Sequence, residues 1–329
     1  MQIRRAILTA LPLALAACSL FTAGAANAQA YPSKQITVIV SYPPGGDTDA
    51  LARVFAEKLA LRVSQPVIVE NKPGASGTIG NSFVAKAPAD GYTLLFTPNT
   101  FSIAPLVLKA GAGAMYDPLN DFTPIILAGT QSLFLVANTS AGVSSVKELV
   151  AAAKAGKVTS YGSPGSGSPM HILGAMFNKS ADIKLNQVPY RGSGPAVVDL
   201  VGGHIPFMYT TLGPVAQHIA SGKLVNLGVA DPQRSSLAPN VPTLQESGYK
   251  DADVGAWQGL MAPKGLPADM QRSLNAHFNE ILKMPDVRAK MITLALVPAG
   301  GEPAELTKMN VEHNTRYGKA IKEHNIQAD

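Results

Sequence analysis

Short apolar runs alternate with amphipathic segments along most of this chain, and the first pair sets the pattern. Residues 36–40 form an unbroken apolar, β-branched run, which predicts a strand buried on both faces. Apolar residues recur at helical spacing over 51–59, so we expect a helix that begins near Asp47 or Thr48. Between strand and helix lies Pro-Pro-Gly-Gly at 43–46, which predicts a tight turn.

The order of strand, polar turn and helix recurs along the first part of the chain. Residues 67–69 and 92–96 predict strands, and the turns at 72–80 and 97–100 follow them. Three such units in about 65 residues predict a parallel, doubly wound sheet.

A second α/β unit is predicted after residues 125–127. Ser145 opens one helix with a capping box, Ser168 caps another that has Pro169 at its first position, and a third starts at Pro195. We expect an irregular return that contains residues 243–246, Trp257 and Pro263. We expect helices over residues 267–322. The strands of this unit are predicted at 133–136, 158–161, 187–190, 205–210 and 224–229.

Residues 1–30 predict a secretory signal peptide. Arg4 and Arg5 precede a largely apolar stretch, and Ala-Gln-Ala at 28–30 has the form of a signal-peptidase site. Leu-Ala-Ala-Cys at 15–18 resembles a lipobox, so acylation and membrane anchoring at Cys18 stay an alternative to release after Ala30. Cys18 is the only cysteine of the sequence, so release after Ala30 leaves a thiol-free mature chain.

The charge balance narrows the class of ligand. Loss of Arg4 and Arg5 lowers the formal net charge from +5 to +3, and no block of Lys and Arg remains. This argues against a nucleic-acid surface and suits a small anionic ligand. About 300 mature residues suffice for two domains, and no later stretch reaches the ~18 apolar residues of a membrane helix.

Five loops rich in Gly, Ser, Thr and Asn follow predicted strands. In open α/β sheets, ligands bind beyond the carboxyl ends of the strands, where such loops meet. Backbone N–H groups at helix starts and small hydroxyls suit carboxylate or phosphate oxygens. One such turn is equally well explained as a plain connection, but five, split between two domains, favour a ligand cleft between the domains. The loops are 43–49, 73–80, 97–100, 162–168 and 191–194.

Motifs of enzymes are missing from the sequence. It has no Gly-x-Ser-x-Gly, no Gly-x-Gly-x-x-Gly and no Walker loop, and its six histidines lack metal-ligand spacing. His171 near Ser166 and Ser168 leaves a periplasmic serine hydrolase as an alternative. Arg191 is explained equally well as a side chain that binds a ligand carboxylate and as a solvated surface side chain. We expect Trp257 to pack in the core or at a hinge rather than to line a ligand site.

A series of motifs runs in order from residue 31 almost to the end. They are Tyr-Pro-Ser-Lys at 31–34, Pro-Pro-Gly-Gly at 43–46 with Asp49 and Arg53, Glu-Asn-Lys-Pro-Gly-Ala at 70–75, Ala-Pro-Ala-Asp-Gly-Tyr-Thr-Leu at 87–94, Gly-Ser-Gly-Ser at 165–168 with His171, Val-Pro-Tyr-Arg-Gly at 188–192, Asp-Leu-Val-Gly-Gly at 199–203, Val-Pro-Thr-Leu at 241–244 and Trp-Gln-Gly-Leu at 257–260. In these motifs the chain resembles the Bug-type extracytoplasmic solute-binding proteins of tripartite tricarboxylate transporters.

The resemblance implies a type II periplasmic-binding-protein fold of two doubly wound α/β domains with a ligand cleft between them. One domain would comprise 31–130 plus 255–329, and the other 131–254. It further implies a periplasmic monomer without cofactor, metal or enzymatic activity, which delivers a small organic carboxylate to a membrane permease. A sensor protein as partner stays an alternative. We expect ligand contacts from Gly45, Gly46, Asp47, Thr48, Ser76, Thr97, Asn99, Ser163, Ser166, Gly167, Ser168, His171 and Arg191.

Two departures from the family pattern concern the ligand. Family members often have an acid within the segment that here is 174–177, and many have an Asp just after the strand at 205–210. Such an acid would be a natural partner for an ammonium group. Their absence favours, as a hypothesis, a carboxylate without an amino group.

Overall fold

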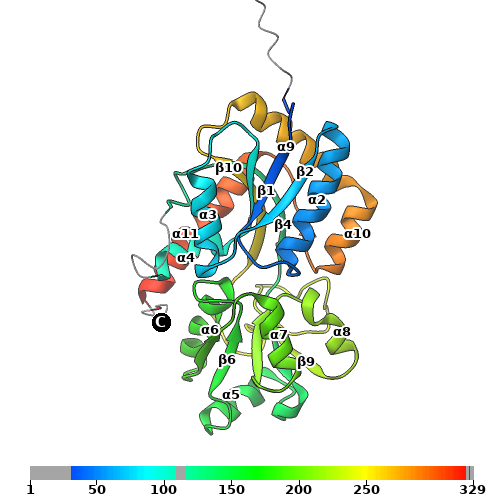
Figure 1. Ribbon diagram of the computed structural model, residues 1–329. Helices are drawn as coiled ribbons and strands as arrows, with labels where there is room; N and C mark the ends of the chain where they lie inside the picture. The colour runs from blue at the N-terminus through cyan, green and yellow to red at the C-terminus, as the bar shows by residue number, and fades with distance from the viewer. Residues whose placement is uncertain (1–30, 109–115, 324–325, 327–329) are drawn as a thin grey trace, which may run out of the picture. The chain divides into compact units, whose positions relative to one another are not determined.

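The computed structural model describes residues 31–108, 116–323 and 326, which from Lys34 onward form one compact unit (Figure 1). The predicted signal peptide and Cys18 lie outside the described residues. Two β-sheets with helices packed on them make up this unit, so the predicted α/β class is confirmed. None of the described helices has both the length and the apolarity that crossing a membrane requires.

The first sheet has six strands in the order β11-β4-β10-β3-β1-β2. β1 lies between β2 and β3 and runs parallel to both, as the repeated strand–turn–helix pattern predicts. The strands are β1 (Ile36–Val40), β2 (Val67–Asn71), β3 (Thr93–Pro98), β4 (Phe122–Gln131), β10 (Ala256–Pro263) and β11 (Val297–Pro298).

Strand β10 corrects two predictions. It runs antiparallel to β3 and to β4, so the sheet is mixed rather than wholly parallel. We expected Trp257 in an irregular return, but it lies within β10. Its side chain is fully buried and belongs to the core, which agrees with its interpretation as a packing residue. Both faces of β10 are covered, so its sequence lacks the alternation of a half-exposed strand, and Gln258 and Gly259 interrupt its apolar run.

The second sheet has five strands in the order β7-β6-β8-β5-β9. β6 runs parallel to β7 and β8, whereas β5 runs antiparallel to β8 and β9. The strands are β5 (Phe134–Asn138), β6 (Ser160–Ser163), β7 (Asn186–Pro189), β8 (Phe207–Thr210) and β9 (Leu224–Val229).

The helices divide between the two sheets. Those with the first sheet are α2 (Asp47–Val63), α3 (Thr78–Ala85), α4 (Thr100–Val107), α9 (Ala268–Lys283), α10 (Pro285–Thr293) and α11 (Pro303–Glu323). Those with the second are α5 (Val146–Lys154), α6 (Pro169–Ser180), α7 (Ser193–Val201) and α8 (Ala216–Ala220). Short 3₁₀ turns occupy Ala75–Gly77, Thr139–Ala141 and Gly213–Val215. We call each sheet with its helices the first and the second lobe.

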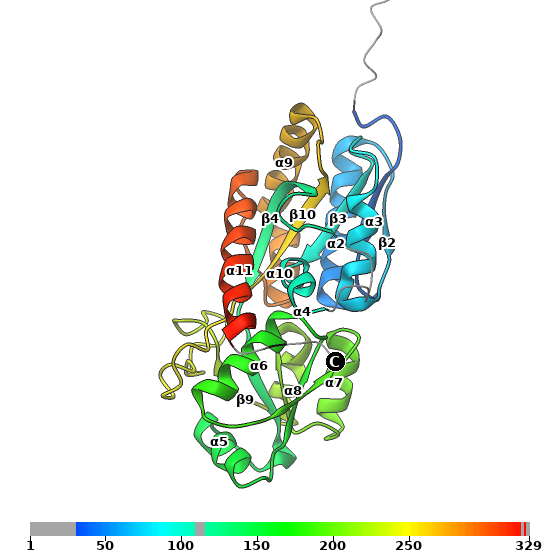
Figure 2. The same cartoon turned by 90° about the vertical axis from the view of Figure 1, so that its left-hand side faces the viewer.

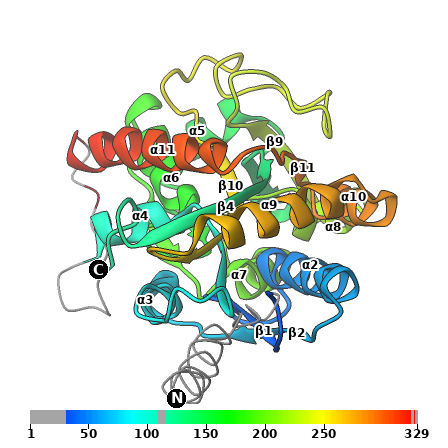
Figure 3. The ribbon, with the colours of Figure 1, turned by 90° about the horizontal axis from the view of Figure 1, so that it is seen from above.

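Helix positions follow local signals closely. α2 starts at Asp47 as predicted and lies beside α9 and α10 (Figure 3). Ser168 caps α6 and Pro169 follows it, again as predicted. α7 starts at Ser193 rather than at the predicted Pro195, so Gly192 is its N-cap.

Three connections tie the lobes together. Two residues, Ser132 and Leu133, separate β4 from β5, and a long return leads from β9 to β10. Helix α11 lies along β4 (Figure 2), and its later residues, Tyr317 and Ile321 among them, belong to the core of the second lobe. The predicted domain limits at 130/131 and 254/255 stay a proposal.

Candidate functional site

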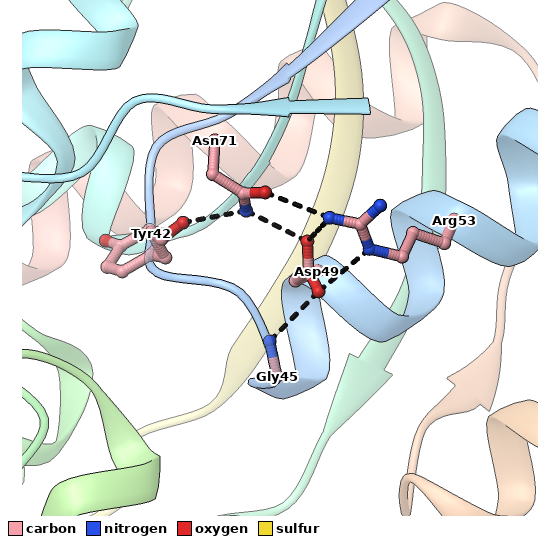
Figure 4. Close-up of polar contacts among 5 residues, drawn as sticks. All are labelled: Tyr42, Gly45, Asp49, Arg53 and Asn71. Atoms are coloured by element: carbon pink, nitrogen blue, oxygen red, sulfur yellow. Dashed lines mark hydrogen bonds and ion pairs between the residues drawn. The ribbon is translucent and has the colours of Figure 1, made fainter. Parts of the chain in front are cut away.

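The turn after β1 is held in shape by Asp49 in the first turn of α2. Its carboxylate accepts hydrogen bonds from the Gly45 N–H (3.0 Å), from Nε and Nη2 of Arg53 (3.1 and 2.9 Å) and from Nδ2 of Asn71 (2.9 Å) (Figure 4). Nδ2 of Asn71 also donates to the Tyr42 carbonyl at 3.0 Å. This cluster therefore ties the ends of β1 and β2 to the start of α2.

The cluster also keeps Asp49 charged. Burial opposes ionisation of its carboxyl, but hydrogen bonds from Arg53, Gly45 and Asn71 outweigh burial, so the pKa of Asp49 lies below its usual value. The carboxylate is thus ionised at neutral pH and paired with Arg53, and its role in the turn is structural.

Helix α2 begins with exposed backbone. Gly45 has a φ of +92°, in the left-handed region that favours glycine, and Gly46 is the N-cap. A glycine cap has no side-chain oxygen to bond the first N–H groups, and a Cβ at either position would meet open space. The Gly45 N–H already donates to Asp49, and Asp47 and Asp49 lie in the first turn, so part of the positive end of the α2 dipole is left for an anion.

Helix α7 presents a second start of the same kind. Its N-cap is Gly192, with a φ of +111°, and Arg191 directly precedes it. Helix α6 differs, because the Ser168 hydroxyl accepts the His171 N–H at 3.2 Å and so caps the helix internally. The second lobe thus offers the start of α7 to a ligand.

A cavity of about 200 Å³ lies where these helix starts meet. Its volume is below the roughly 300–1,000 Å³ of sites for drug-sized ligands, so it suits a small molecule. It is lined by Tyr42, Pro43, Pro44, Gly45, Gly46, Asp47, Thr48, Asp49, Ser76, Pro98, Asn99, Thr100, Gln131, Pro164, Gly165, Ser168, Pro169, Met170, Arg191, Gly192, Ser193, Gly194, Pro195, Thr211, Ala256 and Gln258.

A second cavity of about 710 Å³ adjoins the first. The two share Tyr42, Ser76, Gly165 and Arg191, so they form neighbouring parts of one cleft between the lobes.

The predicted contact residues separate into three groups. Eight line the smaller cavity, and they are Gly45, Gly46, Asp47, Thr48, Ser76, Asn99, Ser168 and Arg191. Ser166 lines the larger cavity instead. Thr97, Ser163, Gly167 and His171 line neither of these two described cavities.

The last group has structural roles. Thr97 is fully buried in β3, and the Ser163 hydroxyl accepts Nε2 of Gln187 at 2.6 Å. A Cβ at Gly167 would lie 2.9 Å from Cα of Ala104, so glycine is needed where backbones approach closely. Small polar residues of these kinds cap helices and close turns as often as they bind ligands.

His171 is also part of a helix start. Its Nδ1 accepts the Gly167 N–H at 3.1 Å, while its own backbone N–H bonds the Ser168 hydroxyl. These two contacts tie His171 to the loop that precedes α6.

Several cavity residues were not foreseen from the sequence. Gln131 ends β4, Thr211 follows β8, and Gln258 lies in β10, so distant parts of the chain bring them together. Gln258 could have been suspected as a polar residue inside an apolar run, whereas Gln131 ends a strand and Thr211 follows one without any local motif.

Asp47 lines the smaller cavity, and its side chain also makes hydrogen bonds within the protein. Its Oδ2 accepts the Thr211 hydroxyl at 2.8 Å, which links the two lobes, and Nε2 of Gln131 at 3.5 Å. Burial raises the pKa of Asp47, and these hydrogen bonds oppose the rise in part. The hypothesis of a ligand without an amino group rests on the missing acids at 174–177 and just after the strand at 205–210, and it stays a prediction.

Metal binding has no support in the described part of the chain, where no group of three or more His, Cys, Asp or Glu side chains is suitably placed.

Comparison with known proteins places this chain in a family. Residues 51–326 match the tripartite tricarboxylate transporter family receptor, TctC. Protein BugT of Bordetella pertussis is 35% identical over 316 residues, which cover 94% of this chain and 96% of BugT.

Solved structures agree with the sequence match. R. palustris Rpa4515 with adipate has a TM-score of 0.84 and 29% identity, covering 90% of this chain and 99% of its own. MatC from Rhodopseudomonas palustris with bound malate has a TM-score of 0.82 and 28% identity, covering 88% and 100%. The fold is thus that of the TctC and Bug periplasmic binding proteins, as the resemblance implied. The chain belongs to the tripartite tricarboxylate transporter receptor family, whose members are periplasmic solute-binding proteins.

Proposed function

We propose that this protein captures a small organic carboxylate in the periplasm and delivers it to a membrane transporter of the tripartite tricarboxylate type. The observation that carries the proposal is the cavity onto which both glycine-capped helix starts open, one from each lobe. Helix starts favour anions, and Arg191 adds a full positive charge at the same cavity. The carboxylates bound to Rpa4515 and MatC support this choice of ligand class.

The proposed mechanism is closure rather than catalysis. A carboxylate held by α2 and α7 bridges the lobes and favours the state in which they lie together. The short β4–β5 connection at Ser132 and Leu133 is suited to act as a hinge, since few residues separate the two sheets there. The family consists of solute-binding receptors, which favours binding over ester or amide hydrolysis.

The proposed location follows from the family and from residues 1–30. We expect export, release after Ala30 and a soluble mature chain in the periplasm. The intact mass of the protein recovered from the periplasm tests this, because acylation at Cys18 would give a longer and lipid-modified chain.

The binding proposal is tested by thermal-shift and calorimetric titration with mono-, di- and tricarboxylates. A ligand that binds the native state raises the melting temperature in a concentration-dependent way. Gly46→Val should abolish this shift, because the added side chain enters the cavity and covers the α2 start while the backbone at Gly46 tolerates it.

Ala151→Val is the control. Ala151 is exposed in α5 and lies outside the two described cavities. We expect it to keep the shift. Unchanged carboxylate affinity in a folded Gly46→Val variant would remove α2 from the site, and turnover of an ester or amide would favour a hydrolase.

Uptake by intact cells tests the transporter partner. Cells that lack the permease subunits should fail to accumulate the labelled carboxylate even though the receptor is present. Undiminished uptake, together with a changed response to the ligand, would instead indicate a sensor partner.

A further inference from the structure

Asp47 is a partly buried carboxyl group in the wall of the smaller cavity, and the side chains that bond it are uncharged. The Thr211 hydroxyl donates to its Oδ2 at 2.8 Å, and Nε2 of Gln131 donates to the same atom at 3.5 Å. No ion pair among the described residues includes Asp47. A carboxylate that is shielded from water and has no cationic partner is costly, so its charge depends on what else the cavity holds.

The ionisable groups nearest in the fold leave Asp47 without a counter-ion. On α2, the Asp49 carboxylate is paired with Arg53. Tyr42 follows β1 and stays neutral, because burial raises the pKa of its hydroxyl. Arg191 precedes α7 and lines the cavity, but it makes no ion pair with Asp47. The cationic side chain at this cavity is therefore left for a ligand.

Helices α9 and α10 pack beside α2 but contribute their charged groups farther along it. Asp286 of α10 pairs with Lys58, and His277 of α9 accepts Nε of Arg62. At 1.5 Å per residue these positions lie about 16 Å and about 22 Å along α2 from Asp47. They are too distant to set its charge.

The positive end of α2 is shared between Asp47 and an incoming anion. Asp47 is the first residue of the helix and accepts its own backbone N–H, so the helix start favours its charge in the unliganded protein. A ligand carboxylate at Gly45 and Gly46 would occupy the same helix end and bring a second negative charge into the cavity. When two carboxylates share a site, the pKa of one of them rises strongly.

We propose that the protein binds its carboxylate together with a proton, and that Asp47 takes up this proton from the solvent. The inference rests on the proposed function, since it assumes a carboxylate in this cavity. Both side-chain donors bond Oδ2, which leaves Oδ1 as the atom that can bind the proton. Burial already raises the pKa of Asp47 in the unliganded protein, so protonation costs less there than at an exposed carboxyl.

Calorimetric titration of the mature protein with adipate and with malate tests the proposal at about pH 6.5, 7.5 and 8.5. Carboxylic acids of this kind are ionised throughout this range, so a change in affinity reports on the protein. We expect the dissociation constant to rise with pH, by up to about tenfold per pH unit, because one proton enters with each ligand. Titrations in two buffers of different ionisation enthalpy measure the same uptake directly, and they need no variant.

Asp47→Asn keeps the size of the side chain and an acceptor for Thr211 but removes the carboxyl group. Its affinity should not depend on pH, and at about pH 8.5 it should exceed that of the natural protein, since an amide needs no proton. A purely structural role of Asp47 predicts weaker binding at every pH. Thr211→Val removes a hydrogen bond that lowers the pKa of Asp47, so the loss of affinity should move to higher pH.

Asp231→Asn is the matched control. Burial raises the pKa of Asp231 as well, and its carboxyl bonds Ser132 at the proposed hinge, but it lies outside the two described cavities. We expect this variant to keep the pH dependence. His171→Gln should keep it too, which tests a side chain type that titrates near the same pH range.

Constant affinity between about pH 6.5 and 8.5 without proton uptake would overturn the proposal and leave the proposed function standing. A pH dependence that persists in folded Asp47→Asn, or that disappears in either control, would overturn it as well. Binding of aspartate without proton uptake, where malate and adipate fail to bind, would overturn it in favour of a ligand ammonium group that pairs with Asp47. If no mono-, di- or tricarboxylate binds at any of these pH values, the proposed function fails and the proposal fails with it.

Discussion

Asp49 offers a strong test of how the Pro-Pro-Gly-Gly turn keeps its shape. The Asp49→Ala variant removes an acceptor that receives four hydrogen bonds, from Gly45, twice from Arg53 and from Asn71. The Asp49 side chain is 5% exposed and that of Arg53 is 51% exposed, so the Arg53 bonds can be replaced by water and contribute little.

The magnitude comes from the bonds that water replaces less readily. Those from Gly45 and Asn71 to a buried carboxylate contribute about 1.5 kcal/mol each at the lower end of the range for charged acceptors. We therefore expect Asp49→Ala to lower the free energy of unfolding by about 3 kcal/mol. Carboxylate affinity should fall by about tenfold, because the freed Gly45 no longer holds the turn.

Urea unfolding and calorimetric titration measure the two effects. Glu280→Ala is the control, since the Glu280–Lys283 ion pair is exposed and screened by solvent, so its loss should leave the free energy of unfolding almost unchanged. The pKa of Asp49 is lowered in the folded state, so its contribution is complete above about pH 4 and is lost as the pH falls through the folded pKa. An Asp49→Ala variant as stable as Glu280→Ala, with unchanged affinity, would refute the reasoning.

Two further predictions concern residues outside the turn. Burial, and secondarily the charge of Arg316, lower the pKa of His313 to about 4. As the pH falls, the unfolded chain therefore binds a proton at this histidine before the folded chain does. The free energy of unfolding should fall by up to about 3 kcal/mol between about pH 6.5 and pH 4. His313→Gln should flatten this dependence in urea unfolding, and an equally steep dependence would exclude His313 as its source. In α11, Gly318→Ala should raise stability by about 0.5–1 kcal/mol, since its Cβ meets Cδ1 of Leu106 at an ordinary 3.5 Å. Gly174→Ala in α6 should instead lower stability by more than about 1 kcal/mol, because its Cβ would lie 2.2 Å from the Tyr161 ring. Thermal melts measure both variants. A change of melting temperature in the same direction for both glycine substitutions would contradict the contact argument.

Local signals predicted local structure well. The start of α2 at Asp47 and the Ser168–Pro169 start of α6 depend on neighbouring residues alone, so the sequence contains what is needed to find them. Strand β10 is buried by helices and strands that are distant in the sequence. Its residues therefore lack the alternation of apolar and polar positions that marks a half-exposed strand. Trp257 was consequently assigned to the core but not to a strand.

Eight predicted contact residues line the smaller cavity, and Gly45 and Gly46 are the two glycines among them. Gly45 and Gly46 belong to a motif whose backbone role can be read from residue type. Ser163 and Gly167 have the same residue types, yet they support turns, because composition does not show which way a hydroxyl or an N–H points. Gln258 lies in the Trp-Gln-Gly-Leu motif at 257–260, but that motif indicates the family and does not show that Gln258 lines a cavity.

The bond between Asp47 and Thr211 has a kinetic consequence. Its acceptor lies in the ligand cavity, and its donor belongs to the other lobe. A ligand that contacts Asp47 therefore contacts one partner of the hydrogen bond that must break before the lobes separate. Ligands that strengthen or compete with that hydrogen bond should differ mainly in how long they stay bound rather than in how fast they enter. Residence time, more than affinity alone, would then decide what fraction of the ligand is still bound when the protein reaches the membrane.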